Sequence, residues 1–220
     1  SVILEDGKKI IAKALRVGGL GTAGPEEVIA EIMKVSGLNE SDISCSVVTG
    51  YGRNKYEGCD LEVSELTCQD AKVICLNDSG RMTNFVMNDK CAAGTGRFLD
   101  VMANILRADI SELEVLASKA DSPATISSTC TVFAESEVIS QLANGESREN
   151  VIAGICNSVA SRVSSLARRA GVKEKVCMSG GVAKNGAVRD AMSKALEVQI
   201  EYDSLAQYFG AIGAAVYAFR

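Results

Sequence analysis

The sequence predicts an α/β fold in which two related halves follow each other along the chain. Segments typical of strands alternate with segments that have helical spacing, which is the pattern of this fold class. An order of hairpin, helix and strand occurs twice, from residue 1 and again from residue 69. We therefore expect a shortened first subdomain over 1–68 and a second over 69–220, with a last helix at 205–218 that packs back toward the first.

The first half opens with a predicted hairpin at residues 1–17. Two apolar runs flank the polar turn Glu5-Asp6-Gly7-Lys8, whose composition is typical of a tight turn. Pro25 then begins a helix, because proline suits the first helical position and apolar residues follow at helical spacing. A short buried strand over 45–48 follows this helix.

The second half opens with a second predicted hairpin, formed by residues 72–76 and 82–87 around an Asn-Asp-Ser-Gly turn. A further strand over 176–178 runs into a pair of glycines. Apolar spacing predicts helices over 97–107, 111–119, 132–143, 148–170, 186–196 and 205–218.

The composition is that of a globular protein and argues against two classes of partner. Hydrophobic residues make up 47% of the chain and charged residues 23%. The net charge is −5 without a long basic run, so a nucleic-acid surface is not expected. Apolar stretches such as 211–219 are too short to cross a membrane, and no leader-like segment opens the chain. We expect a cytoplasmic protein whose first residues lie in the middle of a strand.

Histidine is absent and cysteine is frequent, and both facts restrict the chemistry. Without histidine the chain lacks the usual general base and the commonest zinc ligand. No two cysteines have the C-x-x-C spacing of a local zinc or ferredoxin-type site. A metal site must therefore collect thiolates from distant segments or from two chains. The eight cysteines are Cys45, Cys59, Cys68, Cys75, Cys91, Cys130, Cys156 and Cys177.

Two of these cysteines directly precede predicted helices. Cys91 lies in a loop with Gly94 and Gly96 before one helix, and Cys130 comes immediately before another. The unpaired N–H groups at a helix N-terminus favour a bound anion, and a thiolate-ligated cluster carries negative charge. Two thiolates from each of two identical chains would complete a four-thiolate iron–sulfur site on a twofold axis.

The alternative for any single cysteine is a small buried apolar side chain without chemistry. We expect this for Cys75 and Cys177, which strand residues flank, and for Cys156 in an apolar helix. The loop context of Cys91 and Cys130 leaves both possibilities open. A structural zinc held by four thiolates at the dimer axis is a further alternative.

A strand, a double glycine and a helix together mark a candidate nucleotide site at 176–185. Gly180 and Gly181 would let a nucleotide approach the backbone while N–H groups of the next helix face it. Close packing of strand and helix explains such a pair equally well. The glycine-rich run at 18–24 lacks a following Lys-Ser/Thr and is not a Walker loop.

Two long motifs carry a family resemblance: NDKCAAGTGRFLD at 88–100 and SSTCTVFAESE at 127–137. Both resemble the activator ATPases of 2-hydroxyacyl-CoA dehydratases, relatives of the benzoyl-CoA reductase ATPase subunits. Shorter matches at 49–54, 179–183 and 205–208 extend the resemblance over nearly the whole chain. It implies the actin-like, sugar-kinase-like ATPase fold, with ribonuclease H-like halves around a nucleotide cleft.

The resemblance also implies an ATP-driven electron carrier. Members of this family are homodimers that share one [4Fe-4S] cluster, whose ligands match Cys91 and Cys130. ATP binding and hydrolysis, with Mg²⁺, drive an electron from ferredoxin or flavodoxin through the cluster into the dehydratase. The implied partners are therefore a second copy of the chain, a 2-hydroxyacyl-CoA dehydratase and one of these donors, in an anaerobic metabolism.

The same resemblance assigns nucleotide contacts. Gly180, Gly181 and Lys184 match the adenosine side, and Gln207 is a weaker candidate. Asp100, on the helix that leaves the cluster loop, either faces the nucleotide or is a solvated helix position.

Two elements of the family are missing from this sequence. The family opens with a strand and an acidic phosphate loop, and a second strand with a Gly-Gly-Gln-Asp loop precedes the second hairpin. Here the chain begins after the first element, and Cys68 joins directly to Gln69 and Asp70, the remnants of the second. We expect Asp70 to be the catalytic residue and Gln69 a nucleotide contact. An incomplete sequence explains both losses better than a chain impaired for ATP, because the rest keeps the family pattern.

Two other functions remain open. A small-molecule kinase of the same fold would need a catalytic aspartate at a sugar pocket and would hold no cluster. A dimer that binds the cluster without ATPase activity is the second.

Overall fold

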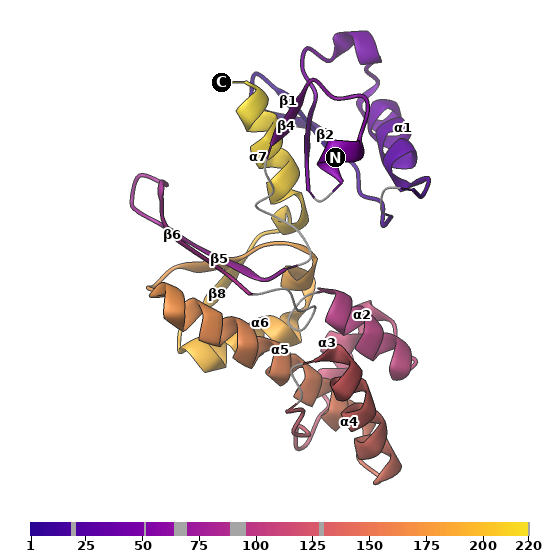
Figure 1. Cartoon of the computed structure of the whole chain (residues 1–220), viewed down its shortest axis with the longest axis vertical. Coiled ribbons are helices and arrows are strands. Elements are labelled where there is room, and N and C mark those ends of the chain that lie inside the picture. Colours follow the sequence, from indigo (N-terminus) through magenta and orange to yellow (C-terminus); the bar gives the residue numbers. More distant parts are fainter. Residues whose placement is uncertain (19–20, 51, 64–69, 89–95, 128–129, 220) are drawn as a thin grey trace. The chain divides into compact units, whose positions relative to one another are not determined.

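The computed structural model describes residues 1–18, 21–50, 52–63, 70–88, 96–127 and 130–219. The chain divides into two compact units (Figure 1). Unit 1 consists of Ser1–Cys68 and Gln207–Arg220, and unit 2 of Gln69–Ala206.

In its described residues, unit 1 contains short paired strands and two α-helices. The first pair, β1 and β2, is the predicted antiparallel hairpin. Asp6 and Gly7 at its turn have φ of 53° and 63°, as in the type I′ turns that suit the twist of a hairpin. The elements are β1 (Val2–Glu5), β2 (Lys9–Lys13), α1 (Gly24–Ser36), β3 (Val47–Thr49), β4 (Leu61–Val63) and α7 (Phe209–Ala218).

Helix α1 begins and ends as its sequence indicates. Pro25 lies in its first turn, and Gly37 ends it with φ of 71°, the left-handed conformation that glycine adopts at helix C-termini. Ile32 is buried against Ala12 and Ala14, so α1 covers one face of the β1–β2 hairpin.

Helix α7 packs against β1 and β3, although it comes last in the chain. A Cβ atom on Gly7 would lie 2.7 Å from the Phe219 ring, so the hairpin turn needs a glycine beside the end of this helix. The sequence predicts a second subdomain over 69–220 whose last helix packs back toward the first. Helix α7 packs on strands of unit 1, and residues Gln207–Arg220 belong to that unit, so unit 2 ends at Ala206.

Strand β4 was not predicted and pairs in parallel with β3. Its three residues, Leu-Glu-Val, alternate between apolar and polar, but a run of three is too short to be recognised as a strand.

Unit 2 contains two pairs of strands and five helices within the described residues. The hairpin of β5 and β6 is antiparallel, as predicted, and β7 pairs in parallel with β8, which was not predicted. The elements are β5 (Lys72–Leu76), β6 (Met82–Met87), α2 (Gly96–Ile105), α3 (Leu113–Ala117), α4 (Thr131–Ala143), α5 (Arg148–Ala170), β7 (Val176–Met178), α6 (Gly186–Leu196) and β8 (Ile200–Tyr202).

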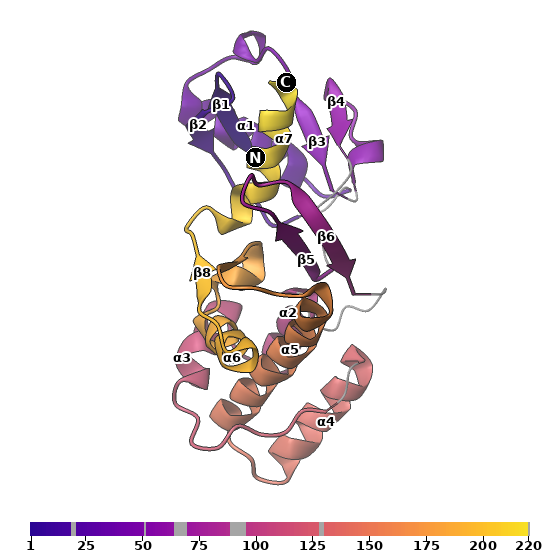
Figure 2. The same cartoon turned by 90° about the vertical axis from the view of Figure 1, so that its left-hand side faces the viewer.

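Helix α5 lies at the centre of unit 2, flanked by α6 and α4 (Figure 2). The Ser147 side chain accepts a hydrogen bond from the Asn150 N–H at its N-terminus, and Gly171 ends it in the left-handed conformation. Gly154 lies against the carbonyl of Ala124, where a Cβ atom would collide with backbone. The preceding segment of the chain therefore lies directly on this helix.

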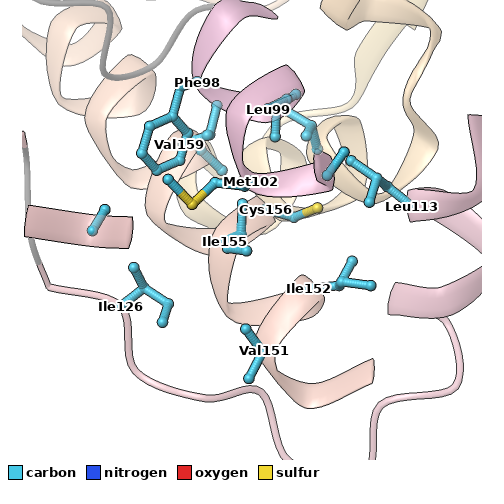
Figure 3. Close-up of a cluster of buried hydrophobic side chains, with 14 of the residues drawn as sticks. Phe98, Leu99, Met102, Leu113, Ile126, Val151, Ile152, Ile155, Cys156 and Val159 are labelled. Atoms are coloured by element: carbon cyan, nitrogen blue, oxygen red, sulfur yellow. The ribbon is translucent and has the colours of Figure 1, made fainter. Parts of the chain in front are cut away.

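The core of unit 2 forms where α2 crosses α5 (Figure 3). Phe98 and Met102 of α2 are fully buried and belong to one cluster with Ile155 and Val159 of α5. The Arg162 guanidinium lies over the Phe98 ring at 4.9 Å from its centroid, which adds a cation–π contact at the edge of this cluster.

In the part of the chain that the structure describes, no helix is long and apolar enough to cross a membrane.

We predict that Phe98→Ala lowers the free energy of unfolding by about 3–5 kcal/mol, because it empties a fully buried site. Phe133→Ala is the matched control, since this side chain is 68% exposed, and it should change stability by less than about 0.5 kcal/mol. Urea unfolding of both variants measures the difference. Equal effects would contradict the assignment of this core.

Candidate functional site

Cys130 stands at the N-terminus of a helix, as the sequence indicates. It is the residue before α4 and has extended backbone angles, φ of −85° and ψ of 134°. Its carbonyl accepts the Ala134 N–H at 2.9 Å, the first hydrogen bond of the helix. The side chain is half-buried and forms no disulfide. A thiolate here would lie beside the unpaired N–H groups of the first helical turn.

Cys91, the second predicted ligand, lies outside the described residues, as do Gln69 and Gly94. The structure does begin α2 at Gly96, close to the predicted start of the helix after the Cys91 loop. No group of three or more cysteine or acidic side chains within the described ranges comes together as a metal site.

The double glycine leads first into a 3₁₀ turn and then into a separate α-helix, α6. Gly180 has φ of 88° and ψ of −176°, a conformation that is essentially restricted to glycine. Its N–H donates to the Ala206 carbonyl at 2.9 Å. Gly181–Lys184 then forms a 3₁₀ turn, and α6 begins at Gly186 after the N-cap residue Asn185. Gly181 and Lys184 are exposed, so the turn presents backbone and one amino group to solvent.

Two charged side chains form hydrogen bonds to the backbone of this turn and of the residue that begins α6. The sequence did not indicate either of them. The Glu114 carboxylate accepts the Gly186 N–H at 2.8 Å, across 72 positions of sequence. The Arg189 guanidinium donates to the Ala183 carbonyl and stacks on Tyr202 at 4.5 Å from the ring centroid. Glu114 lies outside every motif, so only the tertiary structure reveals its role.

The turn also lies close to the helix that follows the predicted cluster loop. A Cβ atom on Gly96, the first residue of α2, would lie 3.5 Å from Cγ2 of Val182, which is ordinary van der Waals contact. The candidate adenosine turn and the N-terminus of α2 therefore lie close together, with room for about one methyl group between them.

The candidate nucleotide contact Gln207 and the N-cap residue Asn185 each have a buried polar atom without a hydrogen-bond partner among the described residues. These are Nδ2 of Asn185 in unit 2 and Oε1 of Gln207 in unit 1. A buried polar atom normally has a partner, so each fits a bound polar group. The sequence indicated Gln207 but not Asn185.

The two candidate aspartates differ in their surroundings. Asp70 is half-buried and lies just before β5. Asp100 is exposed on α2, a position compatible with solvent and with a ligand.

The remaining cysteines separate by burial. Cys156 is 2% exposed, as expected, and burial raises the pKa of its thiol to about 12. Cys75 is half-buried and donates to the Ala170 carbonyl at 3.5 Å. Cys177 was expected to be buried, but it is exposed because it occupies the outward position of a three-residue strand. Partial burial, with the charges of Asp203 and Glu201, raises the pKa of the Cys177 thiol.

Comparison with known proteins identifies the family. The family model described as the BadF/BadG/BcrA/BcrD ATPase family matches residues 63–218. The chain belongs to this family.

Relatives in this ATPase family include dehydratase activators. The chain is 50% identical over 240 aligned positions to the (R)-2-hydroxyglutaryl-CoA dehydratase activating ATPase of Acidaminococcus fermentans, covering 100% of this chain and 92% of the relative. It is 47% identical over 238 positions to the 2-hydroxyisocaproyl-CoA dehydratase activator of Clostridioides difficile, covering 99% and 90%. The resemblance to dehydratase activators is therefore confirmed.

The fold agrees with a solved activator. The structure of the 2-hydroxyisocaproyl-CoA dehydratase activator from Clostridium difficile with bound ADPNP matches with a TM-score of 0.93 and 46% identity, covering 99% of this chain and 89% of that one. The predicted actin-like ATPase fold is confirmed, and membership in this family supports ATP binding.

Length distinguishes this ATPase from its relatives. The alignment with the Acidaminococcus protein occupies 240 positions and uses all of this 220-residue chain, so the relative has internal residues without a counterpart here.

We predict that Gly180→Ala lowers stability by about 1–3 kcal/mol, because alanine is strained at this φ and ψ. The same variant should weaken ATP binding, since the turn must shift to relieve the strain. Urea unfolding and calorimetric titration with ATP measure the two effects. Gly213→Ala is the control, because a Cβ atom there meets nothing within 4 Å. If both variants behave alike, the turn has no special conformational requirement.

Proposed function

We propose that this protein activates a 2-hydroxyacyl-CoA dehydratase by ATP-dependent transfer of one electron from a [4Fe-4S] cluster. The observation that carries the proposal is the position of Cys130, a half-buried thiol at the N-terminus of α4. The names of two relatives, both dehydratase activators, support the activating role.

The residues of one chain suit half of a cluster. Cys130 and Cys91 give two thiolates, and a four-iron cluster takes four. A homodimer on a twofold axis through the cluster completes the set with the same residues of a second chain. The N-terminus of α4 then directs its N–H groups at a negatively charged group, which is electrostatically favourable. When bound, the cluster would supply one-electron chemistry at low potential.

ATP would bind with its adenosine part at the glycine turn. Gly180 and Gly181 leave the backbone open, and Lys184 is exposed beside them. The buried oxygen of Gln207 fits an acceptor for a nucleotide N–H. On the phosphate side, Gln69 and Asp70 remain as candidates, with Asp70 as the catalytic residue that acts with Mg²⁺. Asp100 is a further candidate because its side chain is accessible.

The closeness of Val182 to Gly96 offers a route from nucleotide to cluster. A nucleotide shifts a conformational equilibrium only if it binds one state better than the other. A displacement of the 3₁₀ turn by ATP would press on the N-terminus of α2, the helix that follows Cys91. Helix movement at the cluster would change its solvation and hydrogen bonding, which tune its potential.

The proposed partners follow from this reaction. They are a second copy of the chain, the dehydratase that accepts the electron, and ferredoxin or flavodoxin as the donor. The setting would be the cytoplasm of an anaerobic organism.

One observation favours a second candidate function, a cluster-binding dimer without ATPase activity. The internal residues that this chain lacks relative to the Acidaminococcus protein include candidates for phosphate contacts, since a phosphate-loop strand is expected before Gln69. Calorimetry with ATP and ADP separates the two functions, because only the ATPase binds nucleotide.

Iron and acid-labile sulfide of the anaerobically purified protein test the proposal. We expect about four irons per dimer and a brown chromophore, because four thiolates hold a four-iron cluster. Cys91→Ser and Cys130→Ser should each lose the iron, since each removes two ligands from the dimer. Cys177→Ser is the control and should keep it, because this exposed thiol lies on β7 outside both motifs.

Iron at background in the intact protein after anaerobic reconstitution would contradict the cluster. A colourless protein that holds zinc without sulfide would indicate the structural zinc site instead.

A further inference from the structure

The segment that leads to Cys130 is tied to the helix that follows Cys130. Both carboxylate oxygens of Glu137 accept the Ser127 N–H, at 2.9 and 3.1 Å, and one of them accepts the Ser127 hydroxyl at 2.9 Å. Glu137 lies on α4, two turns beyond Cys130, and Ser127 lies three residues before Cys130. The carboxylate therefore closes a loop of chain that contains the cysteine.

A second contact lies one turn further along α4. The Gln141 side-chain amide donates to the Thr125 carbonyl at 3.4 Å. Thr125 pairs with Gln141 and Ser127 with Glu137, so the segment runs antiparallel to the helix toward its N-terminus. Between these two contacts Ile126 is buried in the core of unit 2 (Figure 3). The buried Ile126 side chain therefore fixes the position of this segment along the axis of α4.

We propose that Glu137 is a positioning residue for Cys130 as a cluster ligand. This inference rests on the proposed function. From the helix side, the backbone of Cys130 is fixed by the Ala134 N–H bond to its carbonyl. From the loop side, the Glu137–Ser127 pair holds the backbone three residues before Cys130. Hydrogen bonds to an ionised carboxylate are stronger than neutral ones, and here three converge on one side chain.

Loss of the Glu137–Ser127 pair is expected to affect the cluster ligand Cys130 and not the overall fold. Residues outside the ligand set orient metal ligands, and their substitution typically costs about 10- to 100-fold in metal affinity. Ser127 is exposed, and Glu137 is half-buried on α4, at the edge of the face that Ala134 and Val138 bury. Loss of the pair should therefore loosen the approach to Cys130 while the helix stays packed.

The test compares Glu137→Gln with Glu135→Gln. Both variants remove one negative charge from the same helix, but two residues turn a helix by about 200°, so Glu135 lies on a different face. We expect a chelator to remove iron from the reconstituted Glu137→Gln dimer at least about tenfold faster than from the wild type. Glu135→Gln should match the wild type. Equal rates for all three proteins would overturn the inference while leaving the proposed cluster intact.

A second measurement uses the cluster-free chain. Alkylation of Cys130, followed by mass spectrometry of peptides, should be faster in Glu137→Gln, and alkylation of Cys177 should not change. Thermal unfolding of the cluster-free chain should be nearly unchanged as well. A general loss of stability, with equal acceleration at both cysteines, would show a structural role only and overturn the inference.

Ser127→Ala gives an independent variant. It removes the hydroxyl donor but keeps the N–H donor, so we expect an intermediate rate of iron loss. The double variant should resemble Glu137→Gln alone, because the two side chains act as one unit. Fully additive effects would overturn the inference. Absence of iron from the wild type would instead refute the proposed function.

Discussion

The architecture of unit 2 depends on the burial of one long helix. Helix α5 has 23 residues, and about half of them are buried, including the glycine that lets the segment at Ala124 lie on its backbone. Helices α2, α4 and α6 gain their stability mainly by covering this apolar surface. The N-termini of these helices are consequently fixed relative to one another. The hydrogen bonds within each helix would not fix these relative positions.

This constraint brings the helix N-termini of the candidate site together within unit 2. The 3₁₀ turn before α6 lies close to the first residue of α2, and Cys130 directly precedes α4, which packs against α2. Polar side chains then set the finer geometry: Glu114 and Arg189 at the turn, and Glu137 at the cysteine. A nucleotide at the turn and a cluster at the helix N-termini would therefore act on one connected body of helices.

The sequence predicts the elements whose signals are local. Both hairpins, the ends of α5 and α6, and the strand before Gly180 follow from turn residues, caps and apolar spacing. Strands β4 and β8 have three residues each, Leu-Glu-Val and Ile-Glu-Tyr, and so short an alternation does not predict a strand whose parallel pairing only the fold shows. Cys130 was identified as a candidate ligand because its motif is contiguous. Glu114 and Glu137 were not, because each acts on a backbone group that only the fold brings near.

Native mass spectrometry of the anaerobically reconstituted protein tests the shared cluster most directly. The account predicts a species of two chains with one four-iron, four-sulfide cluster, which separates into single chains when a chelator removes the iron. A single chain that carries a complete cluster, or a dimer that forms and persists without iron and sulfide, would contradict it.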